Sequence, residues 1–365
     1  RLVVTNQDGR AIPAQFRPLA RWGGVVDDER LPIRWLEVAI MDDVPADSTQ
    51  RYRLKQFEDP AQAPPRPLTV SSEGNRYVVD TGVAEFTVDP ANPALIDRIR
   101  MGMNVVYRHR PGAGPKLVLR GGQALDTGNP GRVTIDDDSF VVIDRGPIKA
   151  TFAVQGHFID PNGATLCDRF PDVPAYQSLG FTAVLTLTRG QTHVDLQFQF
   201  RNECSDLFNA GAPWPGSTTV DQVSWELPLG IANGERRYFA GAGPIRETND
   251  DVIVEQRKGS GNPWRRRARV RVAGDEEETA AGFERPMVGL SDGEITVTAQ
   301  MPWMRFREPQ ALSADQSGIS IRMVGEPLTI GAAKGLWNFA RLSFVAEVNA
   351  PADLERSREQ NAAAL

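Results

Sequence analysis

The chain has 365 residues, of which 41% are hydrophobic and 24% are charged, a composition typical of a folded protein with more than one domain. Its net charge of −6 excludes a general nucleic-acid binder, because such proteins neutralise phosphates with a basic surface. No apolar run approaches the roughly 20 residues that a membrane-spanning helix needs.

The first 57 residues predict a small β-barrel of short strands. In the third strand, apolar Ile33 and Trp35 alternate with polar Arg34, which indicates one buried face and places Trp35 in the core. The expected strands are 2–5, 14–20, 31–41 and 52–56.

Residues 58–68 contain four prolines and few large apolar side chains, so they predict a linker.

Residues 69–348 predict one large antiparallel β-sandwich, because strand patterns recur between Gly, Pro, Asn and Asp turns without amphipathic helices. Trp225 lies within one of these strands and is expected in the core. The expected strands are 77–80, 84–88, 116–119, 133–135, 140–143, 148–158, 180–188, 193–201, 222–229, 252–256, 267–272, 294–301, 318–323 and 342–348. Residues 349–365 predict a short helical tail that begins with Pro and acidic residues.

The chain has two cysteines, Cys167 and Cys204. They form one disulfide if the protein is in an oxidising compartment, and otherwise they are two unpaired thiols. Because sequence supplies no Cα separation, both alternatives stay open. No Cys/His cluster has the spacing of metal ligands, so we expect no metal site and no cofactor.

Tryptophans and arginines supply the candidate binding residues. Tryptophan on a loop rich in Pro and Gly is a platform for a sugar ring or a hot spot for a partner protein. Alternating arginines on one strand can hold carboxylates or phosphates, although a solvated face balanced by the acidic run 275–278 is the simpler interpretation. The candidates are Trp214, Trp264, Trp303, Arg267, Arg269 and Arg271.

Other polar features are interpreted as structural. The three histidines, His109, His157 and His193, lie far apart in the sequence and are expected to have structural or surface roles. The acidic runs 136–138 and 275–278 predict solvated turns. The sequence contains no nucleophile elbow, phosphate-binding loop, zinc-protease motif or dinucleotide fingerprint, so we assign no catalytic residue.

Several segments in order resemble the exo-rhamnogalacturonan lyase-like family. Ala20-Arg21-Trp22 and the strand around Trp35 are similar to its N-terminal RIFT-barrel, although Leu31-Pro32-Ile33 replaces the small-residue entry to that strand. Further matching segments are 8–15, 44–47, 52–54, 77–82, 84–86, 145–150, 156–158 and 304–342. The resemblance implies a RIFT barrel followed by a β-sandwich. In that family an α/α-toroid carries the chemistry, and since these residues contain none, no catalytic residue is carried over.

These observations favour a non-catalytic β-module that docks on partner proteins in a periplasmic, extracellular or membrane-peripheral assembly. One alternative is a binding module for acidic polysaccharides, with Trp214, Trp264 and Arg267 in contact with the glycan. A second alternative is a polysaccharide lyase whose residues the sequence does not reveal.

Overall fold

The structure is a computed structural model that describes residues 2–45, 48–56, 63–160, 166, 179–203, 218–231, 234–239, 245–257, 267–279, 286–302, 304, 310–331 and 334–346. The described chain forms 29 strands in five antiparallel sheets, and none of its residues is in an α-helix. The predicted all-β fold is therefore confirmed. The predicted tail, and residues 58–62 of the predicted linker, lie outside the described residues.

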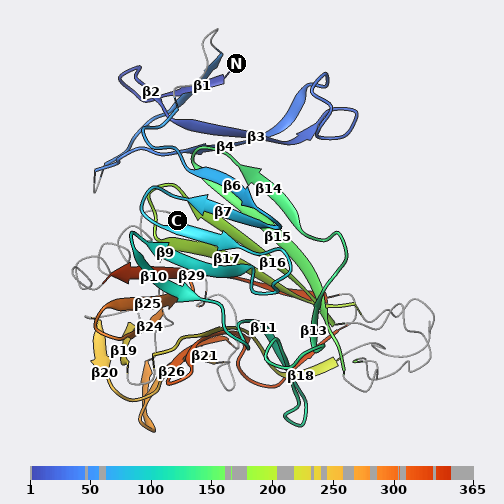
Figure 1. The fold of residues 1–365 in the computed structure, drawn as a ribbon, viewed down its shortest axis with the longest axis vertical. Coiled ribbons are helices and arrows are strands. Elements are labelled where there is room, and N and C mark those ends of the chain that lie inside the picture. The colour runs from blue at the N-terminus through green and yellow to red at the C-terminus, as the bar shows by residue number, and fades with distance from the viewer. Residues whose placement is uncertain are drawn as a thin grey trace, which may run out of the picture.

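The N-terminal region forms two small sheets. A three-stranded sheet has the order β2 (Ala11–Ile12), β1 (Leu2–Thr5), β5 (Arg53–Gln56). A long hairpin of β3 (Ala14–Arg21) and β4 (Ile33–Ile40) projects beside it (Figure 1).

The next five strands form a meander in which every strand pairs with its neighbour in the sequence. Short turns such as Glu73–Arg76 connect them, and every pair of neighbouring strands is antiparallel. The strands are β6 (Thr69–Glu73), β7 (Arg76–Asp80), β8 (Glu85–Val88), β9 (Ile96–Met101) and β10 (Asn104–Arg108).

A nine-stranded sheet forms the lower layer in Figure 1. The strand Thr218–Pro228 pairs with Gly114–Leu119, about 100 residues earlier, and with Gly318–Val324, about 100 residues later. The sheet therefore joins distant parts of the sequence. In spatial order it contains β12 (Ala124–Asp126), β11 (Gly114–Leu119), β18 (Thr218–Pro228), β27 (Gly318–Val324), β26 (Gln310–Asp315), β21 (Val252–Arg257), β22 (Arg267–Val272) and β23 (Asp275–Thr279), with β28 (Leu328–Ile330) beside β18.

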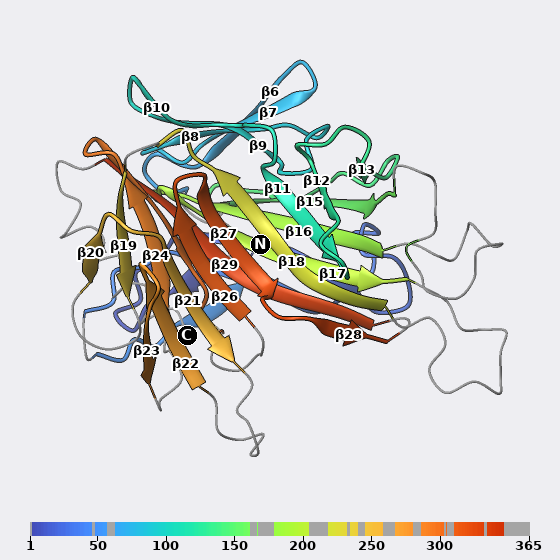
Figure 2. The ribbon, with the colours of Figure 1, turned by 90° about the horizontal axis from the view of Figure 1, so that it is seen from below.

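A ten-stranded sheet packs against the nine-stranded sheet and holds the longest strands, as Figure 2 shows from below. In spatial order it contains β13 (Val133–Ile135), β15 (Lys149–Phe158), β16 (Leu179–Thr188), β17 (His193–Asn202), β29 (Lys334–Ala346), β25 (Ile295–Gln300), β24 (Met287–Ser291), β19 (Glu235–Phe239) and β20 (Arg246–Thr248), with β14 (Val141–Arg145) also paired to β15.

One hydrophobic core lies on the inner face of the ten-stranded sheet. Its strands alternate strictly, so that Phe152, Phe181 and Phe200 are fully buried on one face while their sequence neighbours point to the other. The rings of Phe198 and Trp225 meet edge to face at 5.4 Å and join this sheet to the nine-stranded sheet. Aromatic contacts such as Tyr77–Phe152, at 5.7 Å, join it to the five-stranded meander.

The hairpin is anchored to the ten-stranded sheet by a buried amide. The Gln15 side chain accepts hydrogen bonds from the backbone N–H groups of Ile148 and Lys149, both at 2.9 Å, and donates one to the Lys149 carbonyl at 3.1 Å. The Lys149 ammonium also pairs with Glu37 of β4. The hairpin therefore lies on the outer side of the ten-stranded sheet, opposite the nine-stranded sheet (Figure 1).

One sequence prediction about burial is confirmed, one is wrong, and one predicted solvated turn is an exposed strand. Trp225 is 2% exposed, as expected for a core residue. Trp35 is 61% exposed, because the described residues contain no layer that covers the hairpin at this position. The acidic run 275–278 is not a turn but most of β23, where it pairs with the arginine-rich β22 and places opposite charges side by side.

Candidate functional site

The outer face of the ten-stranded sheet is polar along four adjacent strands. In the first row across β15, β16, β17 and β29, His157 lies opposite Gly180, which in turn lies opposite Arg201. Side chains two residues apart share a face, so the register defines the following rows. They contain Gln155, Thr182, Gln199 and Trp337, then Ala153, Val184, Gln197 and Phe339, then Thr151, Thr186, Asp195 and Arg341.

His157 is held between two carboxylates. Its Nδ1 lies 2.5 Å from Oδ1 of Asp136, which follows β13, and its Nε2 lies 2.7 Å from Oε2 of Glu203, which follows β17. Each ring nitrogen therefore has one carboxylate oxygen within hydrogen-bonding distance. Arg201 extends the network, because its Nη1 lies 3.1 Å from Oε1 of Glu203.

Gly180 allows this network to cross β16. A Cβ at this position would lie 2.9 Å from Nη2 of Arg201 and 3.2 Å from the carboxyl carbon of Glu203. Glycine therefore leaves the space through which Glu203, two strands away, reaches His157. His157, Asp136, Glu203 and Arg201 thus form a charged platform at this end of the sheet.

An aromatic pair borders a pocket next to this platform. The pocket has a volume of about 290 Å³, and its lining includes Thr182, Gln197 and Gln199 together with the rings of Trp337 and Phe339. The two rings meet edge to face at 5.0 Å, and Trp337 is 45% exposed. The pocket thus combines amide and hydroxyl groups with an open ring face.

The three cations of this face are paired with carboxylates. Arg201 bonds Glu203, Arg341 bonds Asp195 at 2.6 and 3.0 Å, and Lys149 bonds Glu37 of the hairpin. Partial burial tends to raise the pKa of Glu37, but hydrogen bonds from Lys149 and Arg17 outweigh it and hold the pKa below its usual range. The face as a whole carries polar groups whose charges are compensated locally.

His193, at the hairpin end of the same face, gives a pH-dependent prediction. Burial, with the nearby Arg341 guanidinium, lowers the pKa of His193 from 6.5 to about 4. The unfolded chain takes up this proton first, so the contribution is complete above pH 6.5 and is lost as the pH falls toward 4. We expect His193→Gln to remove up to about 3 kcal/mol of the acid-induced loss in unfolding free energy, measured by urea denaturation across this window. Parallel pH profiles for the two proteins would contradict the assignment.

Of the sequence-predicted site residues, Arg269 and Arg271 have described side chains, and both lie on β22 of the nine-stranded sheet. Trp214, Trp264, Trp303, Cys167 and Cys204 lie outside the described residues, as does the side chain of Arg267 in β22. Arg269 is buried, and its guanidinium already bonds the carboxylates of Glu255 and Glu276. Arg271 lies 3.6 Å from Glu255.

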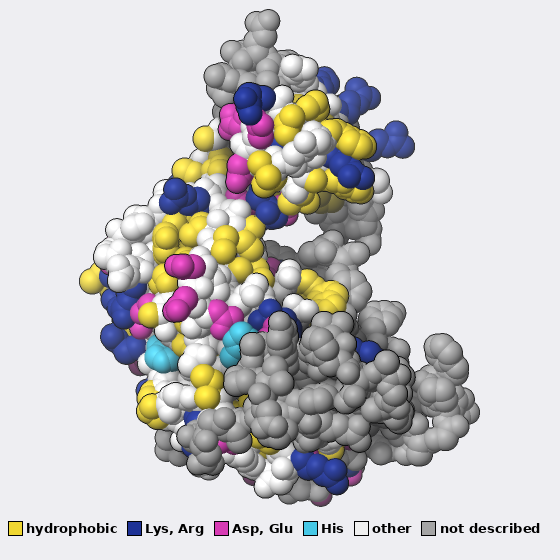
Figure 3. Space-filling view, turned by 90° about the vertical axis from the view of Figure 1, so that its right-hand side faces the viewer, with side chains coloured by type: hydrophobic (Ala, Val, Ile, Leu, Met, Phe, Trp, Pro, Cys, Tyr) yellow, Lys and Arg dark blue, Asp and Glu magenta, His cyan; other side chains and the backbone are white. Residues whose placement is uncertain are grey.

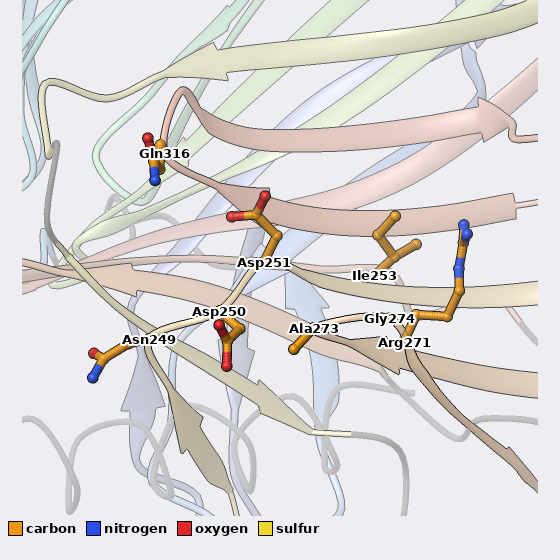
Figure 4. Close-up of a pocket in the computed structure, with 8 residues that line it drawn as sticks. All are labelled: Asn249, Asp250, Asp251, Ile253, Arg271, Ala273, Gly274 and Gln316. Atoms are coloured by element: carbon orange, nitrogen blue, oxygen red, sulfur yellow. The ribbon is translucent and has the colours of Figure 1, made fainter.

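Arg271 lines a second pocket of about 440 Å³ on the nine-stranded sheet. Figure 4 shows its side chain extending away from Asp250 and Asp251, which lie at the other end of the pocket. Asp251 is paired with Arg236 at 3.3 Å. Among the described residues, no group of three or more His, Cys, Asp and Glu side chains is arranged to hold a metal ion.

Sequence reasoning missed the residues of the outer face. The available signal was the alternation His193, Asp195, Gln197, Gln199, Arg201, which places five polar groups on one face of a strand whose other face is apolar. A solvated strand shows the same pattern, so it indicates a site only when His157 and Trp337 are known to lie beside it.

The sequence matches no family model and no curated protein. Among solved structures, the chain is similar in fold to an α-mannosidase from Enterococcus faecalis V583, with a TM-score of 0.53 and 11% identity. It is also similar to a glycosyl hydrolase family 38 protein from Enterococcus faecalis, with a TM-score of 0.57 and 11% identity. In both comparisons all of this chain is covered, but it spans only 40% of the other chain. The chain therefore shares its β-architecture with part of these proteins, and the resemblance to the lyase family stays a prediction.

Within the part of the chain that the structure describes, no helix is long and apolar enough to cross a membrane.

Proposed function

We propose that this protein binds a saccharide on the outer face of its ten-stranded sheet. The observation that carries the proposal is the pocket where Gln197, Gln199 and Thr182 lie beside the exposed ring of Trp337. Amide and hydroxyl groups exchange hydrogen bonds with sugar hydroxyls, and an aromatic ring packs against the apolar face of a sugar ring. The fold shared with part of two carbohydrate-active proteins supports the same proposal.

The charge pattern favours a neutral saccharide over an acidic one. Arg201, Arg341 and Lys149 already bond carboxylates of the protein, so a uronate would have to displace them. The acidic-glycan alternative depended on the arginines of β22, where Arg269 is buried against Glu255. In contrast, carboxylates such as Asp136 keep lone pairs that accept hydrogen bonds from sugar hydroxyls.

Trp337→Ala tests the proposal. Loss of the ring should weaken the binding of a neutral hexose oligosaccharide by about tenfold or more, which corresponds to about 1.4 kcal/mol. Isothermal titration calorimetry with neutral oligosaccharides, and with oligogalacturonate as the acidic comparison, measures this effect. Trp22→Ala is the matched control, because Trp22 is 58% exposed on the hairpin and lies outside the pocket.

The proposal fails if the wild-type protein binds none of the oligosaccharides. It also fails if Trp22→Ala weakens binding as much as Trp337→Ala does. Tighter binding of oligogalacturonate than of every neutral ligand would keep a saccharide function but reject the neutral class.

Docking on a partner protein is a second candidate function. The hairpin tip favours it, because Val25 is 71% exposed and Trp22 is 58% exposed, and such apolar groups are typical of interaction surfaces. In the native extract, a partner that depends on this surface would co-purify with the wild-type protein and be lost with Val25→Lys. Equal recovery with both proteins would exclude the tip as its docking surface.

A further inference from the structure

The underside of the β3–β4 hairpin is defined by its contact with the ten-stranded sheet. Glu37 of β4 points toward that sheet, because its carboxylate bonds Lys149 on the outer face. Side chains alternate along a strand, so Trp35, two residues before Glu37, shares its side, whereas a register shift at Arg34 takes Ile33 out of this alternation. The Arg34 guanidinium carbon lies 4.6 Å from the ring centre of Trp22.

This underside is exposed although it faces the sandwich. Trp35 is 61% exposed, which is high for a large apolar side chain on the inner side of an overhanging element. In Figure 3 the N-terminal region overhangs the sandwich, and a hollow lies beneath it. The hairpin and the sheet are thus held apart rather than packed together.

The overhang is fixed at its base. Gln15 bonds the backbone of Ile148 and Lys149, Glu37 bonds the Lys149 ammonium, and Arg17 lies 3.8 Å from the carboxylate of Asp144 in β14. A hairpin anchored in this way keeps its exposed underside at a set height above the sheet. Preorganised walls of this kind bind a ligand with little ordering cost.

We propose that Trp35 forms the second wall of a two-sided cleft, and that the ligand is an oligosaccharide chain rather than a single sugar. The inference rests on the saccharide function proposed above. From Lys149 at the hairpin to His157 at the far end of β15 the outer face is about 26 Å long, at roughly 3.3 Å per residue. One ring cannot reach both Trp337 and the hairpin, whereas a chain of several rings contacts both.

The composition of the lower wall supports a saccharide as the occupant. The wall is continuous with the pocket at Trp337 and presents the polar Gln197, Thr186 and Thr182 beside the apolar Val184 and Phe339. A second protein copy or an amphipathic peptide would leave these polar groups facing its apolar side chains. Sugar hydroxyls satisfy them, while the rings of the sugars pack against Trp35 above.

A length series of one neutral oligosaccharide, from monosaccharide to hexasaccharide, tests the inference by calorimetry. The wild-type affinity should rise with chain length. Trp35→Ala should leave the affinity for the monosaccharide unchanged and weaken the hexasaccharide by at least about tenfold. Trp22→Ala, beyond the end of β3 at the tip of the same hairpin, should follow the wild type at every length. Circular dichroism confirms that both variants fold, and since both side chains are exposed we expect no change in the spectra.

Three outcomes overturn the inference, and one of them separates it from the proposed function. If Trp337→Ala loses binding while Trp35→Ala binds the hexasaccharide like the wild type, the two-sided cleft is wrong but the saccharide site stands. If no length of saccharide binds the wild type, both are wrong. If sedimentation shows a dimer that Trp35→Ala dissociates and saccharide does not, the underside is an interface between two copies.

Discussion

Gly156→Ala is expected to lower the free energy of unfolding by about 3 kcal/mol or more, near the upper end for overpacked cores. A Cβ at this position would overlap the backbone carbonyl oxygen of Thr134 on the paired strand β13 and come within 2.5 Å of the ring of Phe181. Neither group can move alone, because one belongs to the β13–β15 ladder and the other is fully buried. Urea denaturation at neutral pH measures the change.

Gly180→Ala is the matched control on the next strand. Its Cβ would contact only the ends of the Arg201 and Glu203 side chains, at 2.9 and 3.2 Å, and these can rotate away. We expect a loss below about 1 kcal/mol, together with a disturbed His157–Glu203 contact. Similar losses for the two variants would show that β13 adapts to a side chain at Gly156 and would contradict the packing argument.

The strands could be predicted from the sequence because their alternation is strict. Residues 133–135 and 267–272 match β13 and β22 at both ends, and 193–201 matches β17 to within one residue. Strands such as β9 and β24 were missed. In β24 all five residues are buried, so a polar face that would mark alternation is absent.

The pairing of strands could not be predicted, and the candidate site depends on it. His157 and Glu203 are 46 residues apart, and they meet only because β16 lies between their strands with Gly180 opposite the histidine. Alternation specifies which side chains share a face of one strand, but it does not specify which strands are neighbours. The histidine was therefore interpreted as structural.

The exposure of Trp35 could not be predicted from the sequence either. Alternation correctly placed it in a strand with two distinct faces, but which face is covered depends on elements distant in the sequence. No described layer packs on the hairpin at this position, so the pattern that predicted a core residue produced an exposed one. Exposed aromatic side chains on such a strand are the observation that sequence alone does not supply.

Gln15→Leu is expected to release the hairpin from the sheet. The leucine takes the Gln15 amide away from the N–H groups of Ile148 and Lys149, and unsatisfied buried groups cost about 1–3 kcal/mol each, whereas the Lys149 carbonyl keeps the Gly146 N–H at 3.0 Å. The remaining contacts are partly exposed ion pairs such as Lys149–Glu37, which contribute little. Amide hydrogen exchange in β3 and β4 should become faster, while the core strands β16 and β17 stay protected.

Gln15→Leu also tests whether the anchored hairpin takes part in saccharide binding. If the hairpin supplies the upper wall of the cleft, Gln15→Leu should lower the hexasaccharide affinity to the level of Trp35→Ala, although Gln15 itself is buried and 6% exposed. The monosaccharide affinity should not change, because the pocket at Trp337 belongs to the ten-stranded sheet alone. Gln123→Leu, at an exposed glutamine bonded only weakly to Asp160 at 3.5 Å, should alter neither property. Faster exchange in the hairpin with an unchanged hexasaccharide affinity would mean that the anchored position of the hairpin plays no part in binding.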